Sequence, residues 1–363
     1  TSMERNQHPP DVPHEGMLVW DLEYHRGVQS LRGLDGQIAH SKICFAHDSR
    51  RIAAISLDWR IAIWELPSGF LHSLFEMSPG LTADNSGLAF SHDGRRFACS
   101  VGAEAKLWDL ESGHATTWRL PEGLGDTLAF DATDTRLWLF RVETLDGMHP
   151  PHNRSPARQY PRACRIRDLL ASREHDLHDV GKNKPAWETH EFDAGDVHSQ
   201  ATPDGKYLVA AGRHGLDKRE RVTSVFESAT GKVVLSLPAD DFQLDVTGQL
   251  MLVHMKSDRV GVYELIKLPT GELVDSIAAP FLAIGPGARL VATKAAAGFG
   301  YSLRRRDEQS PFVTLGIDAL TAEGFPTFSS DGGLFAWGNR DGTVTVCHLE
   351  EVQRRLASVG LGW

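Results

Sequence analysis

Arginine is concentrated in one stretch of the chain that contains no acidic residue. The five arginines of residues 154–167 are Arg154, Arg158, Arg162, Arg165 and Arg167, and Tyr160 lies among them. A second basic stretch, residues 213–221, contains Arg213, His214, Lys218, Arg219 and Arg221. Guanidinium groups beside an aromatic ring bind carboxylates or phosphates through paired hydrogen bonds and stacking. The two stretches therefore predict a site for an acidic protein or peptide. The alternative interpretation is that both are solvated loops on an acidic chain.

Histidines near these arginines are the second group with potential chemistry. The cluster comprises His149, His152, His175, His178 and His190. His175 and His178 are three residues apart, a spacing that could bring two metal ligands together on one helical turn, and imidazole is a common ligand of transition metals. We expect this segment to be a turn between two strands, where residues three apart do not converge. His175 and His178 are thus a weak candidate pair, and we expect no metal.

Known catalytic motifs are absent from the sequence. It contains no G-x-S-x-G nucleophile elbow, no P-loop and no H-E-x-x-H zinc motif. The glycine pairs Gly285/Gly287 and Gly298/Gly300 are expected to form turns, because neither pair begins a helix. We therefore expect no catalytic residue and no cofactor.

A repeat of 40–45 residues organises the chain and must position the basic stretches. Its anchor residues, which end a short apolar run, are Phe45, Phe90, Phe130, Ala201, Leu244, Ile284 and Phe328. A turn of the Asp-Gly type and a second apolar run follow most anchors, as at Asp93-Gly94, and this combination predicts a β-hairpin. Two further short strands complete each unit. Four short strands in a unit of this length are typical of one blade of a β-propeller.

Several positions within the repeats resemble the WD40 repeat family. The third strand ends in an aromatic residue followed by an acid, and an Asp can precede that end by six residues. The positions that carry this pattern are Trp20, Asp21, Asp58, Trp64, Trp108, Asp109 and Asp341. The resemblance covers about residues 17–348, in a degenerate form of bacterial type, and implies a rigid disc that binds peptides or partner domains. The usual Gly-His pair is missing, so we expect Asp58 and Asp341 to accept hydrogen bonds from amides of their own turns.

The number of anchors predicts an all-β, seven-bladed WD40-like propeller with a short C-terminal helical tail. Eight blades is the alternative, because Met17–Asp21 adds an eighth third-strand pattern. We expect Val28–Leu31 to pair beside Thr343–His348 and complete the last blade, since an unpaired edge promotes aggregation.

The expected divisions are an N-terminal extension (1–15), a propeller closed by strands from both ends (16–349) and a helical tail (350–363) that packs on the propeller. In the tail, Val352, Leu356 and Val359 form one apolar stripe, and Gly360 ends the helix. Leu361 and Trp363 are then expected to pack back on the propeller.

One irregular interval between anchor residues predicts that the basic stretches lie on one face of the propeller. The interval from Phe130 to Ala201 is 71 residues long, and its extra residues fall at 142–161 and 179–195. We expect 142–161 to connect the second strand (136–140) to the third (163–167), and 179–195 to follow the fourth strand. Both kinds of connection leave a propeller on the same face, where the 213–221 loop should lie beside them. Long loops on a regular scaffold usually carry function.

The composition limits the kinds of partner and the cellular compartment that we expect for this protein. A net charge of −10 argues against nonspecific binding of nucleic acid, and no run of 18 apolar residues exists to span a membrane. The four cysteines, Cys44, Cys99, Cys164 and Cys347, fall in expected strands and lack any C-x-x-C spacing. Buried free thiols fit a reducing compartment. We expect a cytoplasmic monomer with no nucleic-acid or membrane contacts.

The sequence favours a noncatalytic protein-interaction scaffold, which binds a peptide or partner domain on the face that carries the blade-three and blade-four loops. One alternative is an enzyme (a hydrolase, a lyase or a redox-cofactor protein) that uses the central propeller channel. Another is the regulatory module of a larger kinase-like protein, because the tail resembles the ends of large bacterial WD40 proteins, some of which carry a kinase upstream.

Overall fold

The computed structural model describes fourteen segments of the chain. These are residues 27–77, 86–101, 104–119, 124–144, 156–165, 175–176, 192–193, 198–213, 221–255, 262–278, 281–295, 300–308, 310–315 and 326–360. The predicted strand pattern at Met17–Asp21 lies outside them, and so do Trp20 and Asp21.

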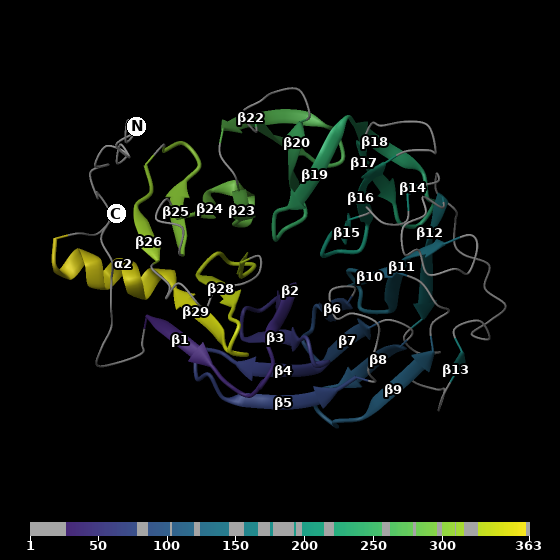
Figure 1. Ribbon diagram of the computed structural model, residues 1–363, viewed down its shortest axis with the longest axis horizontal. Helices are drawn as coiled ribbons and strands as arrows, with labels where there is room; N and C mark the ends of the chain where they lie inside the picture. The colour runs from purple at the N-terminus through teal and green to yellow at the C-terminus, as the bar shows by residue number, and fades with distance from the viewer. Residues whose placement is uncertain are drawn as a thin grey trace, which may run out of the picture.

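Within these segments the strands form seven sheets that stand around a central axis (Figure 1). Sheet 1 contains β2 (Ile38–Phe45), β3 (Arg51–Ser56), β4 (Arg60–Glu65) and β5 (Leu71–Glu76). Sheet 2 contains β6 (Ser86–Phe90), β7 (Arg96–Val101), β8 (Glu104–Asp109), β9 (Ala115–Arg119) and, at its outer edge, β13 (His175–Asp176). Sheet 3 contains β10 (Leu124–Phe130), β11 (Arg136–Thr144), β12 (Pro156–Arg165) and β14 (Phe192–Asp193).

The second half of the chain builds the other sheets in the same order. Sheet 4 contains β15 (His198–Ala201), β16 (Tyr207–Arg213), β17 (Arg221–Glu227) and β18 (Val233–Leu237). Sheet 5 contains β19 (Ala239–Leu244), β20 (Leu250–Met255), β21 (Val262–Lys267) and β22 (Glu272–Ala278). Sheet 6 contains β23 (Phe281–Ile284), β24 (Leu290–Lys294), β25 (Tyr301–Arg305) and β26 (Val313–Leu315), with a 3-10 turn, η2 (Pro286–Ala288). Sheet 7 contains β27 (Thr327–Phe328), β28 (Leu334–Gly338), β29 (Val344–His348) and β1 (Val28–Leu31).

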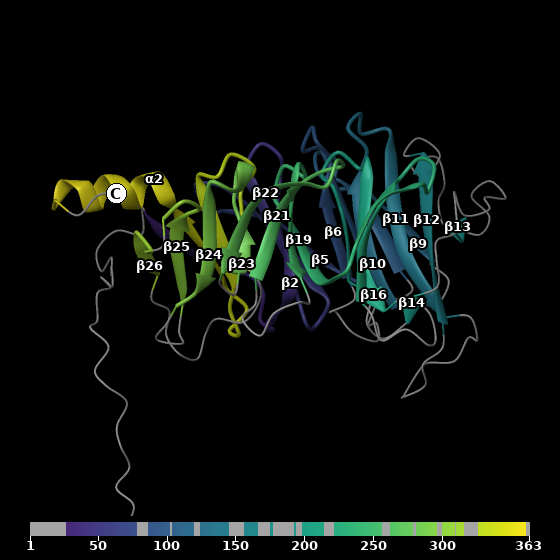
Figure 2. The same ribbon diagram turned by 90° about the horizontal axis from the view of Figure 1, so that it is seen from above.

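Each predicted anchor is the last residue of the innermost strand of its sheet, from Phe45 in β2 to Phe328 in β27. The innermost strands contact those of the neighbouring sheets, and the side view shows the sheets standing next to one another (Figure 2). Local hairpin signals therefore located the inner edge of every sheet correctly.

The two ends of the described chain meet in sheet 7. β1 pairs antiparallel with β29, with Val28 opposite Cys347 and Leu31 opposite Val344. This is the predicted pairing, and it is confirmed. Sheet 7 also joins sheet 1, where the Ile38 amide donates a hydrogen bond to the Asn339 carbonyl (3.3 Å). The ring is thus closed by strands that are far apart in sequence.

Apolar side chains fill the space between neighbouring sheets. Ile63 of sheet 1 packs in one cluster with Phe97 and Trp108 of sheet 2, and the side chain of Phe97 is fully buried. Burial of such a side chain contributes about 1.5–3 kcal/mol. The same interleaving recurs between the other sheets, so each blade is stabilised by its neighbours rather than by a core of its own.

The C-terminal helix α2 (Leu349–Ser358) projects outward beside sheet 7 (Figures 1 and 2). Leu349, Val352 and Leu356 are buried against the core between sheets 6 and 7. The prediction that Val359 belongs to the same stripe is wrong. Val359 is 66% exposed, because the helix ends at Ser358 and the backbone at Val359 (φ −109°, ψ 12°) leaves the helical path. Leu361 and Trp363 lie outside the described residues.

Candidate interaction faces

The ring has two faces that differ in the connections they carry. We define the connection face as the one that carries the links between the second and third strands of each sheet, such as β11–β12 and β16–β17. The turn face carries the hairpin turns between first and second strands, which include residues 91–95 and 131–135. Both faces present polar residues, and their hydrogen bonds decide what each can do.

On the connection face, β11 and β12 form a longer hairpin than the sequence predicted. They are paired from Arg136 opposite Arg165 to Thr144 opposite Ala157. The prediction of a loop is therefore wrong for residues 142–144 and 156–161, which are strand; residues 145–155 lie outside the described residues. Pro156 and Pro161 indicated a loop. Pro156 is the first residue of β12, and Pro161 lies beyond the two residues that pair with β14; proline is tolerated at both kinds of position.

The predicted binding residues occupy regular positions on this hairpin. Arg158, Tyr160 and Arg162 lie at alternate positions of β12, opposite Glu143, Arg141 and Leu139 respectively. In the next sheet Arg213 ends β16 and is paired with Arg221, which begins β17. Arg154, His214, Lys218 and Arg219 lie outside the described residues. The structure thus assigns Arg158, Tyr160 and Arg162 to one strand rather than to a loop.

The fourth strand of sheet 3 was also predicted wrongly. It is β14 (Phe192–Asp193), which pairs with Pro156 and Ala157 and lies within the stretch assigned to the following loop. β13 instead crosses to sheet 2, where His175 pairs with Trp118 in parallel orientation. Local turn signals failed here because the pairing partners are distant in sequence.

The candidate metal pair lies only partly within the described residues. His175 lies in a strand rather than in the expected turn, and His178 lies outside the described residues. Among the described residues, no group of three or more His, Cys, Asp or Glu side chains is arranged to hold a metal ion.

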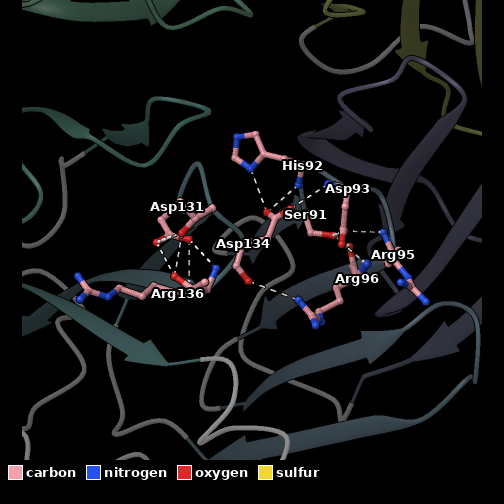
Figure 3. Close-up of polar contacts among 10 residues, drawn as sticks. Ser91, His92, Asp93, Arg95, Arg96, Asp131, Asp134 and Arg136 are labelled. Carbon is pink, nitrogen blue, oxygen red and sulfur yellow. Dashed lines mark hydrogen bonds and ion pairs between the residues drawn. The ribbon is translucent and has the colours of Figure 1, made fainter.

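On the turn face, Asp134 connects sheets 2 and 3 (Figure 3). Its Oδ1 accepts the His92 amide hydrogen (2.8 Å) and its Oδ2 accepts that of Asp93 (2.8 Å). Nδ1 of His92 lies 3.0 Å from the same Oδ1, and Arg96 donates to the Asp134 carbonyl (3.4 Å). Asp134 has a positive φ of 53°, which Asp tolerates better than most residues. We call this group the Asp134 clasp.

Other neighbouring sheets are connected on the same face by different residues. Arg51 donates to the Gly94 carbonyl (2.8 Å) between sheets 1 and 2. The Ser330 hydroxyl donates to the His47 carbonyl (2.6 Å) between sheets 7 and 1. The Gly287 amide donates to Oδ2 of Asp245 (3.1 Å) between sheets 5 and 6. Polar groups of these turns therefore stabilise the ring.

Hydrogen bonds within the turns keep their carboxylates charged. Burial alone would raise the pKa of Asp131, but hydrogen bonds from the Arg136 amide and the Thr133 hydroxyl outweigh it and lower that pKa. Asp93 follows the same pattern: burial opposes ionisation, and the Ser91 hydroxyl and the Arg95 amide lower its pKa overall. Figure 3 shows these contacts on two adjacent turns.

A stacked histidine pair lies beside the clasp. The rings of His47 and His92 have centroids 4.2 Å apart and planes inclined by 16°. Burial and the proximity of His92 lower the pKa of His47, although Asp134 and Asp48 oppose the shift. No sequence motif marks this pair or Asp134, because the relevant turns belong to different repeats.

The WD40-like positions have structural roles where they are described. Trp64 is buried and its Nε1 donates to the Arg32 carbonyl (2.8 Å), and Trp108 stacks on Phe75 with centroids 4.5 Å apart. Hydrogen bonds from the amide and hydroxyl of Ser112 lower the pKa of Asp109.

The two loop aspartates bond within their own turns. Asp341 accepts the Thr343 amide hydrogen (3.0 Å), as predicted. Asp58 instead accepts a hydrogen bond from the Ser56 hydroxyl, a side-chain donor rather than the predicted amide.

The cysteines lie in strands, as predicted: Cys44 in β2, Cys99 in β7, Cys164 in β12 and Cys347 in β29. Cys44, Cys99 and Cys347 are free thiols. Burial raises the pKa of Cys347 to about 12. Such thiols are packing groups rather than nucleophiles.

A closed ring of radially arranged sheets, each with four or five strands, defines the chain as an all-β propeller with a short C-terminal helix. Among solved structures, the β-propeller domain of Cps50 (Swd1) from Myceliophteria thermophila is similar, with a TM-score of 0.57 and 14% sequence identity. The match covers 88% of this chain and 99% of that domain. At this identity the likeness shows the fold alone.

Comparison with models of protein families found no match, and comparison with curated protein sequences found none either. Within the described segments, no helix has both the length and the apolar character needed to cross a membrane.

Proposed function

We propose that this propeller is a monomeric, noncatalytic interaction scaffold of degenerate WD40 type, which acts in the cytoplasm and binds an acidic peptide or partner domain on its connection face. The observation that carries the proposal is the length of the β11–β12 hairpin. It has nine register pairs, whereas the corresponding pair in sheet 1, β3 and β4, has five.

The extra length is at the connection face, because β3 and β11 both begin directly after their hairpin turns. Four additional residues of strand extend the hairpin by about 13 Å. A paired hairpin is a stiffer platform than an irregular loop of equal length, so less conformational entropy is lost when a partner binds.

The composition of β12 indicates the chemistry of the partner. Arg158, Tyr160 and Arg162 share alternate positions, and alternate residues of a strand lie on one face. Arginines that alternate with a tyrosine along a strand suit a partner rich in carboxylates, which arginine binds with two parallel hydrogen bonds. Residues 213 and 221 add two arginines in the neighbouring sheet.

A charge-reversal experiment tests the proposal. Binding of a fluorescein-labelled, glutamate-rich peptide to the full chain is measured by fluorescence anisotropy, with a glutamine-rich peptide of equal length as the reference. The variant Arg158→Glu/Arg162→Glu should weaken binding at least about tenfold, because two charge-assisted contacts become repulsive, without lowering the melting temperature.

The matched control reverses two exposed arginines of the turn face, Arg50→Glu/Arg95→Glu, and changes the net charge equally. The control should bind the glutamate-rich peptide much better than the β12 variant does. Equal losses of affinity in both variants would show that net charge alone causes the effect. Unchanged binding in the β12 variant would overturn the proposed binding face.

A further inference from the structure

Three chemically distinct side chains line up across sheet 5. Asp241 of β19 is opposite His254 of β20, and His254 is opposite Tyr263 of β21. Residues directly opposite one another in antiparallel strands place their side chains on the same face of the sheet. Asp241, His254 and Tyr263 therefore form one transverse row.

This row lies at the connection end of its sheet. His254 is the penultimate residue of β20, and Tyr263 is the second residue of β21. Both therefore lie close to the β20–β21 link. Sheet 5 is also the neighbour of sheet 4, whose strand β17 contacts β19. The row thus belongs to the same face of the molecule as Arg213 and the β11–β12 hairpin.

The two rings of the row are in contact and partly buried. The centroids of His254 and Tyr263 are 4.9 Å apart, with planes inclined by 37°. Tyr263 packs at the edge of a cluster between sheets 5 and 6 that includes Leu252, Leu265 and Ile284. This packing holds the phenol ring in place while part of the side chain is exposed.

Asp241 adds a negative charge beside these rings. Its side chain is exposed, and its Oδ1 accepts the amide hydrogen of Phe242 (2.8 Å), which orients the carboxylate. Burial and, secondly, the charge of Asp241 raise the pKa of Tyr263, so the phenol is neutral at physiological pH. Asp is disfavoured in strands, yet Asp241 stands within β19.

A carboxylate next to stacked aromatic rings has the features needed to recognise a cation. Guanidinium groups stack on aromatic faces and bind carboxylates with paired hydrogen bonds, whereas an ammonium group offers a point charge without a planar face. An arginine side chain can use all three residues of the row.

We propose that Asp241, His254 and Tyr263 form a binding site for an arginine side chain of a partner polypeptide. The inference rests on the proposed interaction function and specifies a second contact on the connection face. A partner that uses both sites carries acidic residues for β12 and an arginine for sheet 5.

A titration with small peptides tests the site directly. The probe is an acetylated and amidated Gly-Arg-Gly peptide, and its reference is the same peptide with citrulline, which has the shape of arginine without its charge. Ring signals of His254 in the full chain, assigned by comparison with His254→Gln, are followed by NMR. The arginine peptide should shift them saturably, and the citrulline peptide should bind at least about tenfold more weakly.

Substitutions separate the contributions of charge and ring. Asp241→Asn, which keeps the shape of the side chain, should weaken arginine binding about tenfold, and Tyr263→Phe should retain most of it because the ring is kept. The matched control is Glu272→Gln, which removes an exposed charge near the turn end of the same sheet and should bind like the wild type. Equal binding of the two peptides, or wild-type affinity in Asp241→Asn, would overturn the site.

The outcome is independent of the test on β12. Arg158→Glu/Arg162→Glu should leave binding of the arginine peptide unchanged, and Asp241→Asn should not weaken binding of the glutamate-rich peptide. Failure of the arginine peptide alone rejects the sheet 5 site, whereas failure of the glutamate-rich peptide alone rejects the acidic-partner site.

Discussion

The turn face and the connection face use the same kinds of residue for different purposes. On the turn face, acidic and hydroxyl side chains are bonded to amides of their own or neighbouring turns, as Asp134 is to His92 and Asp93. On the connection face, β11 and β12 extend beyond the length that the ring requires. This difference indicates that the turn face holds the blades together, and it supports our proposal that the connection face binds the partner.

The largest expected effect is a loss of stability on the turn face. Gly205 has a φ of 65°, and a Cβ atom there would lie 2.7 Å from the Phe130 carbonyl oxygen. Gly205→Ala should lower the free energy of unfolding by about 3–4 kcal/mol through backbone strain and overpacking. Urea denaturation measures the change.

Gly113→Ala is the matched control for this substitution. Gly113 has a similar φ of 71° but open space where a Cβ would stand, so the cost should be about 1–2 kcal/mol from backbone strain alone. Equal destabilisation by the two substitutions would contradict close contact between the turns of sheets 3 and 4.

A smaller loss is expected at the Asp134 clasp. Asp134→Ala leaves the amides of His92 and Asp93 without their acceptor and should lower the free energy of unfolding by about 2–3 kcal/mol. Asp134→Asn keeps one carbonyl oxygen and a residue that tolerates positive φ, so it should lose less. Peptide binding by either folded variant should equal that of the wild type. A selective loss of binding would contradict the separation of stabilising and binding roles between the two faces.

The smallest effect concerns pH. Because the pKa of His47 is lowered in the folded protein, the unfolded chain takes up a proton first as pH falls. This contribution to stability is fully present above the unfolded pKa of about 6.5 and is lost as pH falls below it. The decrease in melting temperature from pH 7.5 to 5.5 should be smaller in His47→Gln than in the wild type. An identical decrease would show that the stacked pair does not resist protonation.

Local signals explain why much of the ring could be predicted. The turns after Phe90 and Phe328 contain Asp-Gly, which tolerates positive φ, so these anchors marked the ends of inner strands without any knowledge of the fold. The closing strand at Val28–Leu31 was predictable because an open edge is unfavourable. Irregular sheet 3 was harder: Pro161 resembled a loop residue, and β13 and β14 pair with segments far away in sequence.

The turn contacts and the proposed sites depend on the register between strands. Asp134 meets His92 only after two repeats are placed side by side, and the row of Asp241, His254 and Tyr263 appears only when three strands are aligned. Neither arrangement has a sequence motif. The arginines at 158 and 162 were found from composition, and their alternate positions on β12 required the structure.

Hydrogen–deuterium exchange of the full chain, with and without the glutamate-rich peptide, tests the division between the faces most directly. The peptide should slow exchange in fragments that cover β11, β12 and the start of β17, and should leave the turns at residues 91–95 and 131–135 unchanged. Protection confined to those turns, with none on β12, would contradict the account.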